Sequence, residues 1–197
     1  MIKKFELRNY KNFKDNIVVN FGKVGSYEFG TDCITDNLIS KMLIYGRNAT
    51  GKTNLGKALI DISLTLNGYS WSNNGIFLNA DSKETTAMFA YTFQFADDEV
   101  VYRYTRISGT ELRDEELIIN GKQIFQCYFG KEKKVNCDLD YLNAEETVIN
   151  RFLQSKDVDN ETENYEVQQI PFLRWIIGNI ALKNMGIKYL CICNCRL

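Results

Sequence analysis

The chain has 197 residues, a length that suits one ordinary domain or one domain with a small appendage. Hydrophobic residues make up 45% and charged residues 25%, a balance typical of a globular protein with its own core. Lysine and arginine number 24 against 25 acidic residues, so the overall charge gives no argument for binding nucleic acid or an anionic membrane. The absence of histidine excludes histidine-based catalysis and histidine metal ligands.

No apolar run approaches the roughly 18–20 residues that span a bilayer, and residues 1–6 lack the features of a secretory signal. We therefore expect a cytoplasmic protein without a membrane partner, whose six cysteines are reduced. Three of them, Cys191, Cys193 and Cys195, lie in the last seven residues. Their spacing matches none of the zinc signatures, so an apolar strand with a ragged end is the alternative to a soft-metal site.

The first 45 residues predict strands and loops. Alternating patterns in residues 4–9 and 17–21 predict a β-hairpin around a polar turn. Residues 22–38 are rich in Gly, Asp, Ser and Thr, and predict a loop. Residues 42–45, Met-Leu-Ile-Tyr, predict a short apolar strand that runs directly into Gly46.

Residues 51–66 predict an amphipathic helix, because apolar side chains recur there at helical spacing. A β-meander follows, with strands at 86–95, 100–107, 116–119 and 122–125. Asn120-Gly121 joins the last two and is a strong hairpin signal. With no helix between them, these strands must be antiparallel. Their aromatic residues are expected to pack in the core rather than to stack on bases: Phe89, Tyr91, Phe93, Tyr102 and Tyr104.

The last third of the chain predicts helices. A cap at Asn143 with Glu146 in the first turn indicates one helix, and residues 171–182 indicate a second. Acidic residues 155–164 predict an exposed loop between them. The chain thus divides into residues 1–138 and a helical segment, 139–197, with the cysteine-rich tail. The basic cluster at 131–134 leaves nucleic-acid binding undecided, because a solvated turn is the alternative.

One motif carries chemistry: residues 46–53, Gly-Arg-Asn-Ala-Thr-Gly-Lys-Thr, match the phosphate-binding Walker A loop G-x-x-x-x-G-K-[ST] at every fixed position. The two glycines allow backbone amides to approach phosphate oxygens. The lysine places a positive charge between the β- and γ-phosphates, and Thr53 offers a hydroxyl to Mg²⁺. The predicted ligand is a nucleoside triphosphate with Mg²⁺, and the alternative is a glycine turn before an ordinary helix. The predicted binding residues are Gly46, Arg47, Asn48, Ala49, Thr50, Gly51, Lys52, Thr53 and Asn54.

The segments LRNYKNFKD, IVVNF and MLIYGRNATGKTNLGKAL resemble the N-terminal part of the ABC-type AAA ATPases related to the OLD, RecF and SMC proteins. The match covers residues 1–66 and extends loosely to about residue 126. It implies an α/β fold, in which a P-loop NTPase N-terminal lobe with an antiparallel meander precedes a mostly helical segment: an incomplete ABC-type ATPase head. The resemblance also implies a loop-shaping role for Asn48 and head-to-head dimerisation around two ATP molecules. It suggests Lys11 or Asn12 near the nucleotide, with a solvated turn as the alternative.

Such an ATPase also needs a strand-end carboxylate for Mg²⁺, a glutamate that activates water, a signature loop and usually a switch histidine. The nearest acidic pair, Asp97-Asp98, reads as a hairpin turn. Gln154, Gln168 and Gln169 are positional candidates for a γ-phosphate sensor, with surface glutamines as the alternative. We therefore expect hydrolysis only if a homodimer or partner chain supplies the missing motifs.

The leading hypothesis is an ATP-binding module of an ABC-type AAA ATPase, and analogy with OLD-like proteins suggests DNA repair or phage defence. The alternatives are a non-hydrolysing, nucleotide-dependent interaction module and a truncated, inactive fragment. A P-loop small-molecule kinase fits poorly, because an antiparallel meander follows the motif. An unfinished sheet would expose an edge and an apolar face, so we expect the isolated chain to be poorly soluble, dimeric or chaperone-dependent.

Overall fold

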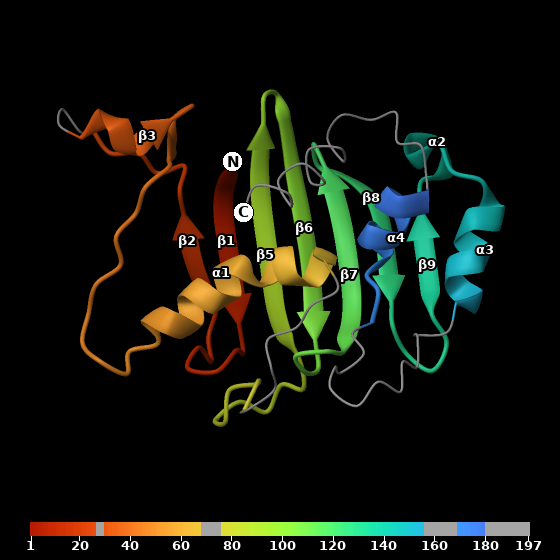
Figure 1. Ribbon diagram of the computed structural model, residues 1–197, viewed down its shortest axis with the longest axis horizontal. Coiled ribbons are helices and arrows are strands. Elements are labelled where there is room, and N and C mark those ends of the chain that lie inside the picture. The colour runs from red at the N-terminus through yellow and green to blue at the C-terminus, as the bar shows by residue number, and fades with distance from the viewer. Residues whose placement is uncertain (27–29, 68–75, 156–168, 180–197) are drawn as a thin grey trace.

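The computed structural model describes residues 1–26, 30–67, 76–155 and 169–179. A seven-stranded sheet dominates it, in the order β2-β1-β5-β6-β7-β8-β9, and every neighbouring pair is antiparallel (Figure 1). The strands of this sheet are β1 (Ile2–Arg8), β2 (Ile17–Asn20), β5 (Ala87–Phe95), β6 (Asp98–Arg106), β7 (Leu112–Ile119), β8 (Lys122–Tyr128) and β9 (Lys134–Cys137).

The other elements are short strands and helices. A small hairpin beside β2 pairs β3 (Ile34–Thr35) with β4 (Leu38–Ile39), after the 3₁₀ helix η1 (Thr31–Cys33). The helices are α1 (Lys52–Asn67), α2 (Leu139–Leu142), α3 (Glu146–Gln154) and α4 (Phe172–Asn179). No helix within these described ranges has the length and apolar character needed to cross a bilayer.

The expected α/β fold with a P-loop core is wrong. Every strand pair in the described part of the chain is antiparallel, so there is no parallel sheet behind the phosphate-loop motif. Residues 42–45, the expected buried strand, form no strand and lie exposed, with Leu43 and Tyr45 retaining 85% and 88% of their accessible surface. A strand needs a neighbouring strand as partner for its backbone hydrogen bonds, and the described strands pair with one another rather than with residues 42–45.

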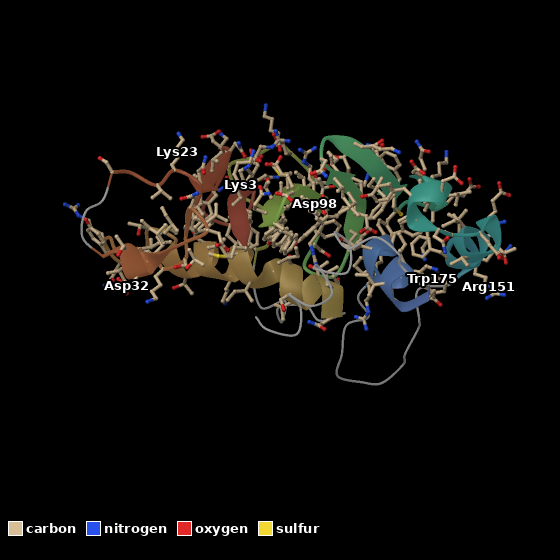
Figure 2. All side chains as sticks on the ribbon, turned by 90° about the horizontal axis from the view of Figure 1, so that it is seen from above. Lys3, Lys23, Asp32, Asp98, Arg151 and Trp175 are labelled. Atoms are coloured by element: carbon tan, nitrogen blue, oxygen red, sulfur yellow. The ribbon has the colours of Figure 1, made fainter. Side chains whose placement is uncertain are left out.

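The two faces of the sheet differ in polarity because side chains alternate along each strand. α1 and α4 lie on the same face (Figure 2), where aromatic residues from several strands form the core. The opposite face carries polar cross-strand pairs: Arg103 Nη1 lies 3.0 Å from Glu116 Oε2, and the Thr105 hydroxyl donates to Asp114 Oδ2 at 2.5 Å. Only one face of the sheet is apolar, and α1 and α4 cover that face.

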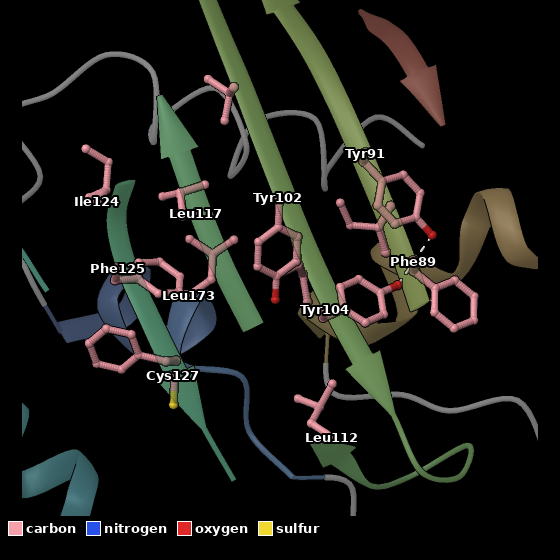
Figure 3. Close-up of a cluster of buried hydrophobic side chains, with 14 of the residues drawn as sticks. Phe89, Tyr91, Tyr102, Tyr104, Leu112, Leu117, Ile124, Phe125, Cys127 and Leu173 are labelled. Atoms are coloured by element: carbon pink, nitrogen blue, oxygen red, sulfur yellow. Dashed lines mark hydrogen bonds between the residues drawn. The ribbon is translucent and has the colours of Figure 1, made fainter. Parts of the chain in front are cut away.

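α1 crosses the sheet and packs Ala58, Ile62 and Leu66 into the core. Tyr91 and Tyr104 lie beneath this helix, with their rings stacked. Figure 3 shows the hydrogen bond between their hydroxyl groups, which are 3.3 Å apart. The expectation that the meander aromatics are core residues is confirmed, since all five that the sequence singled out are buried: Phe89, Tyr91, Phe93, Tyr102 and Tyr104.

A buried polar network also fastens α1 to the sheet. Asp61 Oδ2 accepts the Tyr104 hydroxyl at 2.7 Å and lies 3.5 Å from Arg106 Nε. Arg106 also donates to the Thr65 hydroxyl, which donates to the Asp61 carbonyl oxygen at 2.8 Å. The Asp61 and Arg106 side chains are 6% and 1% exposed. The helix that begins at Lys52 is therefore fixed by a charge pair as well as by apolar packing.

Several local expectations can be compared directly with the structure. The Asn120-Gly121 hairpin is confirmed, with φ of 50° and 78° at its two residues, the left-handed geometry of a type I′ turn. The expected helix cap at Asn143 is wrong: Asn143 ends α2 with a φ of 52°, and Glu145 precedes α3. Residues 180–182 of the second expected helix, the acidic loop from residue 156 and the tail cysteines lie outside the described residues.

Candidate functional site

The motif loop lies between the exposed segment 40–45 and the N-terminus of α1 (Figure 1). Residues 48–51 form a turn, in which Ala49 has a φ of 62° and Gly51 a φ of 91°. The Leu55 amide donates to the Gly51 carbonyl at 2.9 Å, and this bond starts the helix. The loop is therefore curled, and it opens directly into a regular helix.

Gly51 is required by both conformation and space. Its φ lies in the left-handed region, where a side chain is strained. A Cβ placed there would meet Phe13 Cζ at 3.0 Å and Asn12 Cβ at 3.3 Å, so the β1–β2 turn packs against the loop. At Gly46 the φ is not positive and an added Cβ would meet Thr50 Oγ1 at 3.5 Å, an ordinary contact. Only the second glycine of the motif is demanded by its local surroundings.

Lys52 folds back over the loop that precedes it. Its ammonium group donates to the carbonyl oxygens of Gly46, at 2.8 Å, and Arg47, at 2.6 Å. The Thr50 hydroxyl donates to the same Arg47 oxygen at 2.9 Å. These bonds close the loop into a ring and place one positive charge at its centre.

The loop and the β1–β2 turn line an open cavity of about 330 Å³. Lys52 is the one charged side chain in its lining, which contains no carboxylate. The amides of residues 52–54 precede the first helical bond of α1, so they have no acceptor within the helix, and the helix dipole is positive at this end. Such a cavity favours an anion. Its lining residues are Asn12, Asn48, Ala49, Thr50, Gly51, Lys52, Thr53 and Asn54.

The two turn residues that the resemblance suggested are separated by the structure. Asn12 lines the cavity, and its Oδ1 accepts a hydrogen bond from Asn54 Nδ2. Lys11 points elsewhere, because its ammonium group donates to the Ile76 carbonyl at 3.4 Å and lies 5.7 Å from the Tyr10 ring centroid. Of the nine expected loop residues, Gly46 and Arg47 contribute carbonyl oxygens to Lys52 and are not part of the lining.

The acidic residues needed for hydrolysis do not reach this site. Asp97 and Asp98 lie at the β5–β6 turn, beyond the end of β5 that pairs with Ile2, whereas the motif loop packs at the β1–β2 turn, beyond Arg8. The two turns are therefore at opposite ends of the strands. Asp98 Oδ1 accepts from Asn120 Nδ2 at 2.8 Å, which supports the interpretation of this pair as a hairpin turn. Over the described ranges, no three His, Cys, Asp or Glu side chains gather into a possible metal site.

The expected glutamine sensors are not brought to the loop either. Gln154 ends α3, which packs beside β9, across the sheet from the motif loop (Figure 1). The Gln169 side chain accepts the Leu112 amide at 2.8 Å and so anchors the entry to α4. Gln168 lies outside the described residues.

The basic cluster at 131–134 is partly committed to packing. The Lys133 ammonium group donates to the Ser155 carbonyl at 3.0 Å and lies 5.3 Å from the Phe152 ring centroid. Lys134 begins β9. Glu132 interrupts the run of positive charge, so the described geometry offers no continuous basic track here.

Sequence reasoning missed the buried charged groups. Asp61 falls within the apolar stripe of α1, and Glu115 alternates with Leu117 on the core face of β7, where sequence patterns predict apolar residues. These groups could have been recognised in the sequence, because each is a charged residue at a position where the pattern of the helix or strand requires an apolar one. Comparison with protein-family models found no match, and a search of curated proteins found no similar sequence.

Proposed function

We propose that this chain is an ATP-binding module in which residues 46–54 hold the triphosphate. The observation that carries the proposal is the cavity at the N-terminus of α1, whose one charged lining side chain is Lys52. Unpaired helix amides, a positive helix end and a lysine together suit a polyphosphate better than a neutral or cationic ligand. The cavity is open along the loop, so the rest of a nucleotide can extend into solvent or toward a partner.

Each residue has a distinct role in this proposal. Lys52 exchanges its bonds to the Gly46 and Arg47 carbonyl oxygens for bonds to phosphate oxygens, which is favourable because the new acceptors are charged. Thr53 would supply a hydroxyl to Mg²⁺, and the ion would neutralise part of the negative charge of the phosphates. Asn12 accepts a hydrogen bond from the Asn54 side chain, and both residues line the cavity.

The chain binds ATP without turning it over unless another chain contributes the missing groups. No carboxylate lines the cavity, so nothing in the described residues positions a base against an attacking water. The proposal places the module in the ABC-type AAA class, with a homodimer or a partner chain completing the site. Exposed apolar residues 42–45, directly before the loop, support a partner at this position. A cytoplasmic setting with reduced thiols is part of the proposal and accords with the free thiols of Cys33, Cys127 and Cys137.

Binding is tested by titration calorimetry with ATP and Mg²⁺ on the wild-type chain and on Lys52→Ala. A charge-assisted hydrogen bond contributes about 1.5–3 kcal/mol, so the substitution should weaken binding by about 10- to 150-fold. Lys14→Ala is the matched control, because it removes an exposed lysine from the neighbouring β1–β2 turn, outside the cavity lining. Well-folded protein that shows no binding heat, or equal affinity in Lys52→Ala, would refute the proposal.

A turnover measurement distinguishes a module that only binds ATP from a complete ATPase. A phosphate-release assay on the isolated chain should show no steady hydrolysis, and binding should persist with a non-hydrolysable ATP analogue. The alternative, a nucleotide-dependent interaction module, is favoured by the exposed segment beside the loop. It predicts that ATP and ADP change partner affinity to different degrees. Steady turnover that Lys52→Ala abolishes would instead identify a complete ATPase.

A further inference from the structure

Glu115 occupies the centre of the apolar face of the sheet. It lies on β7, directly opposite Tyr104 of β6 and Cys127 of β8, and its side chain is fully buried. Its neighbour on the same face is Leu117, and Figure 3 shows Leu173 of α4 among the side chains of β7 and β8. The carboxyl group therefore lies between the sheet and α4.

The carboxyl group binds the start of α4. Oε1 accepts the Phe172 amide, and Oε2 accepts the Leu173 amide at 3.4 Å. Both amides belong to the first turn of the helix, whose first internal bond runs from the Trp175 amide to the Pro171 carbonyl at 3.0 Å. Oε2 also accepts the Tyr102 hydroxyl at 2.7 Å. One side chain of the sheet thus caps the helix that covers it.

Burial and charge around Glu115 set its protonation. Burial is the largest influence and raises its pKa to about 7, and the Asp114 carboxylate adds to this; hydrogen bonds from Tyr102, Phe172 and Leu173 act in the opposite direction. The ionisable residues that share the core face with it are Tyr102, Tyr104 and Arg106 on β6 and Cys127 on β8. Asp114 is its neighbour in the chain, and α4 carries Arg174.

Asp61, the other buried carboxylate, provides a contrast. Asp61 faces Arg106, so its negative charge is matched within the core. Arg106 donates to the Gly109 carbonyl and the Thr65 hydroxyl and forms an ion pair with Asp61, and no ion pair with Glu115 occurs among the described residues. Glu115 as a carboxylate therefore carries its charge into the core without a paired cation, whereas its neutral form has no charge to bury and still offers an acceptor oxygen to the Phe172 amide.

We propose that Glu115 is a protonation-controlled latch: as a neutral acid it holds α4 on the sheet, and as a carboxylate it favours release of the helix. Release exposes the group to water, and it also exposes three buried anchors of α4, Phe172, Leu173 and Ile176. The direction follows from linkage. A group whose pKa is raised from 4.5 to about 7 in the docked state stabilises the docked helix fully below pH 4.5. This stabilisation of the docked helix is lost as the pH rises through 7.

The expected change is large enough to measure. The difference between the two pKa values corresponds to an increase of roughly 300-fold in the opening equilibrium of α4 between acidic pH and pH above 8. The apolar anchors keep the helix docked for most of the time at any pH in this range. The latch therefore tunes the frequency of opening rather than unfolding the domain, and it does not depend on nucleotide binding.

Amide hydrogen exchange on the full chain tests the latch. Protection of residues 172–179 is measured from pH 5 to 8.5, corrected for intrinsic exchange, with the central strand β5 as the internal reference. We expect α4 protection to fall by about 75-fold relative to β5 over this pH range, because part of the full change lies below pH 5. Glu115→Gln retains a hydrogen-bond acceptor but cannot ionise, so it should remove this slope. Equal pH dependence in α4 and β5, or an unchanged slope in Glu115→Gln, would overturn the proposal.

A second measurement covers the case in which Glu115→Gln fails to fold. The carboxyl carbon of Glu115 is followed by NMR in the wild-type chain, and its midpoint should lie well above that of an ordinary glutamate. Tyr102→Phe removes a donor to the carboxylate, so it should raise the midpoint further. An ordinary midpoint with α4 still protected would show that Glu115 is only a packing residue.

Discussion

The sharpest prediction concerns two glycines at the start of α1. Gly51→Ala should destabilise the fold, because an alanine at φ 91° costs about 1–2 kcal/mol in backbone strain. Its Cβ would also lie 3.0 Å from Phe13 Cζ and 3.3 Å from Asn12 Cβ, and overpacking of this kind costs about 1–3 kcal/mol. The expected total is about 2–5 kcal/mol.

Gly56→Ala is the matched control, five residues further along the same helix. Nothing lies within 4 Å of a Cβ built there, and the position is helical. The free energy of unfolding should therefore rise by about 0.5–1 kcal/mol. Urea-induced unfolding followed by circular dichroism measures both variants.

The two contributions at Gly51 can be separated. Phe13→Leu replaces the ring that a Cβ at residue 51 would meet with a smaller side chain. Combined with Gly51→Ala, it should recover the part of the lost stability that is due to the steric contact, but not the part that is due to backbone strain. Calorimetry with ATP and Mg²⁺ on the same proteins should show weaker binding in Gly51→Ala and unchanged binding in Gly56→Ala. If Gly51→Ala unfolds at the same urea concentration as wild type and binds equally well, the left-handed loop geometry described for residues 48–51 is not that of the protein in solution.

Three further substitutions test other parts of the structure. Asp61→Ala leaves Arg106 buried without its ion-pair partner and should lower the free energy of unfolding by about 3–5 kcal/mol, measured in urea; a loss below 1 kcal/mol would contradict a buried pair. Asn12→Ala removes the bond to Asn54 at an exposed position, so nucleotide affinity should fall several-fold in calorimetry while the melting temperature stays within a degree or two. Gly121→Ala strains the left-handed turn at φ 78° and should cost about 1–2 kcal/mol, without affecting nucleotide binding.

Local patterns in the sequence were sufficient for most of the sheet. Period-2 alternation and the Asn-Gly turn predicted four antiparallel strands of the meander, and helical spacing predicted α1. β7 begins at Leu112, earlier than expected, because charged residues on its outer face obscure the alternation. β9 was not predicted, since Lys134–Cys137 is short and polar and acquires its strand geometry from pairing with β8.

The main error was residues 42–45. An apolar run predicts a buried strand because such residues are usually covered, but burial also requires neighbours that no local pattern reveals. At the candidate site, the motif predicted nine loop residues, of which seven line the cavity. The resemblance suggested Lys11 or Asn12, and only Asn12 lines it. The contact of Phe13 with Gly51, and the bonds from Lys52 to the loop carbonyls, depend on tertiary geometry and could not be predicted from spacing.

The pairing of β1 with β5 has a consequence for how the protein folds. The meander β5–β8 joins strands that are adjacent in sequence, whereas Arg8 must find Met88 across the entire intervening segment that contains α1. Long-range closure is slow compared with hairpin formation. The meander should therefore be the folding nucleus, and β1 should add to its edge afterwards. Because Asn12 in the turn after β1 lines the cavity beside the motif loop, the proposed binding site should be the last part of the structure that a refolding chain completes.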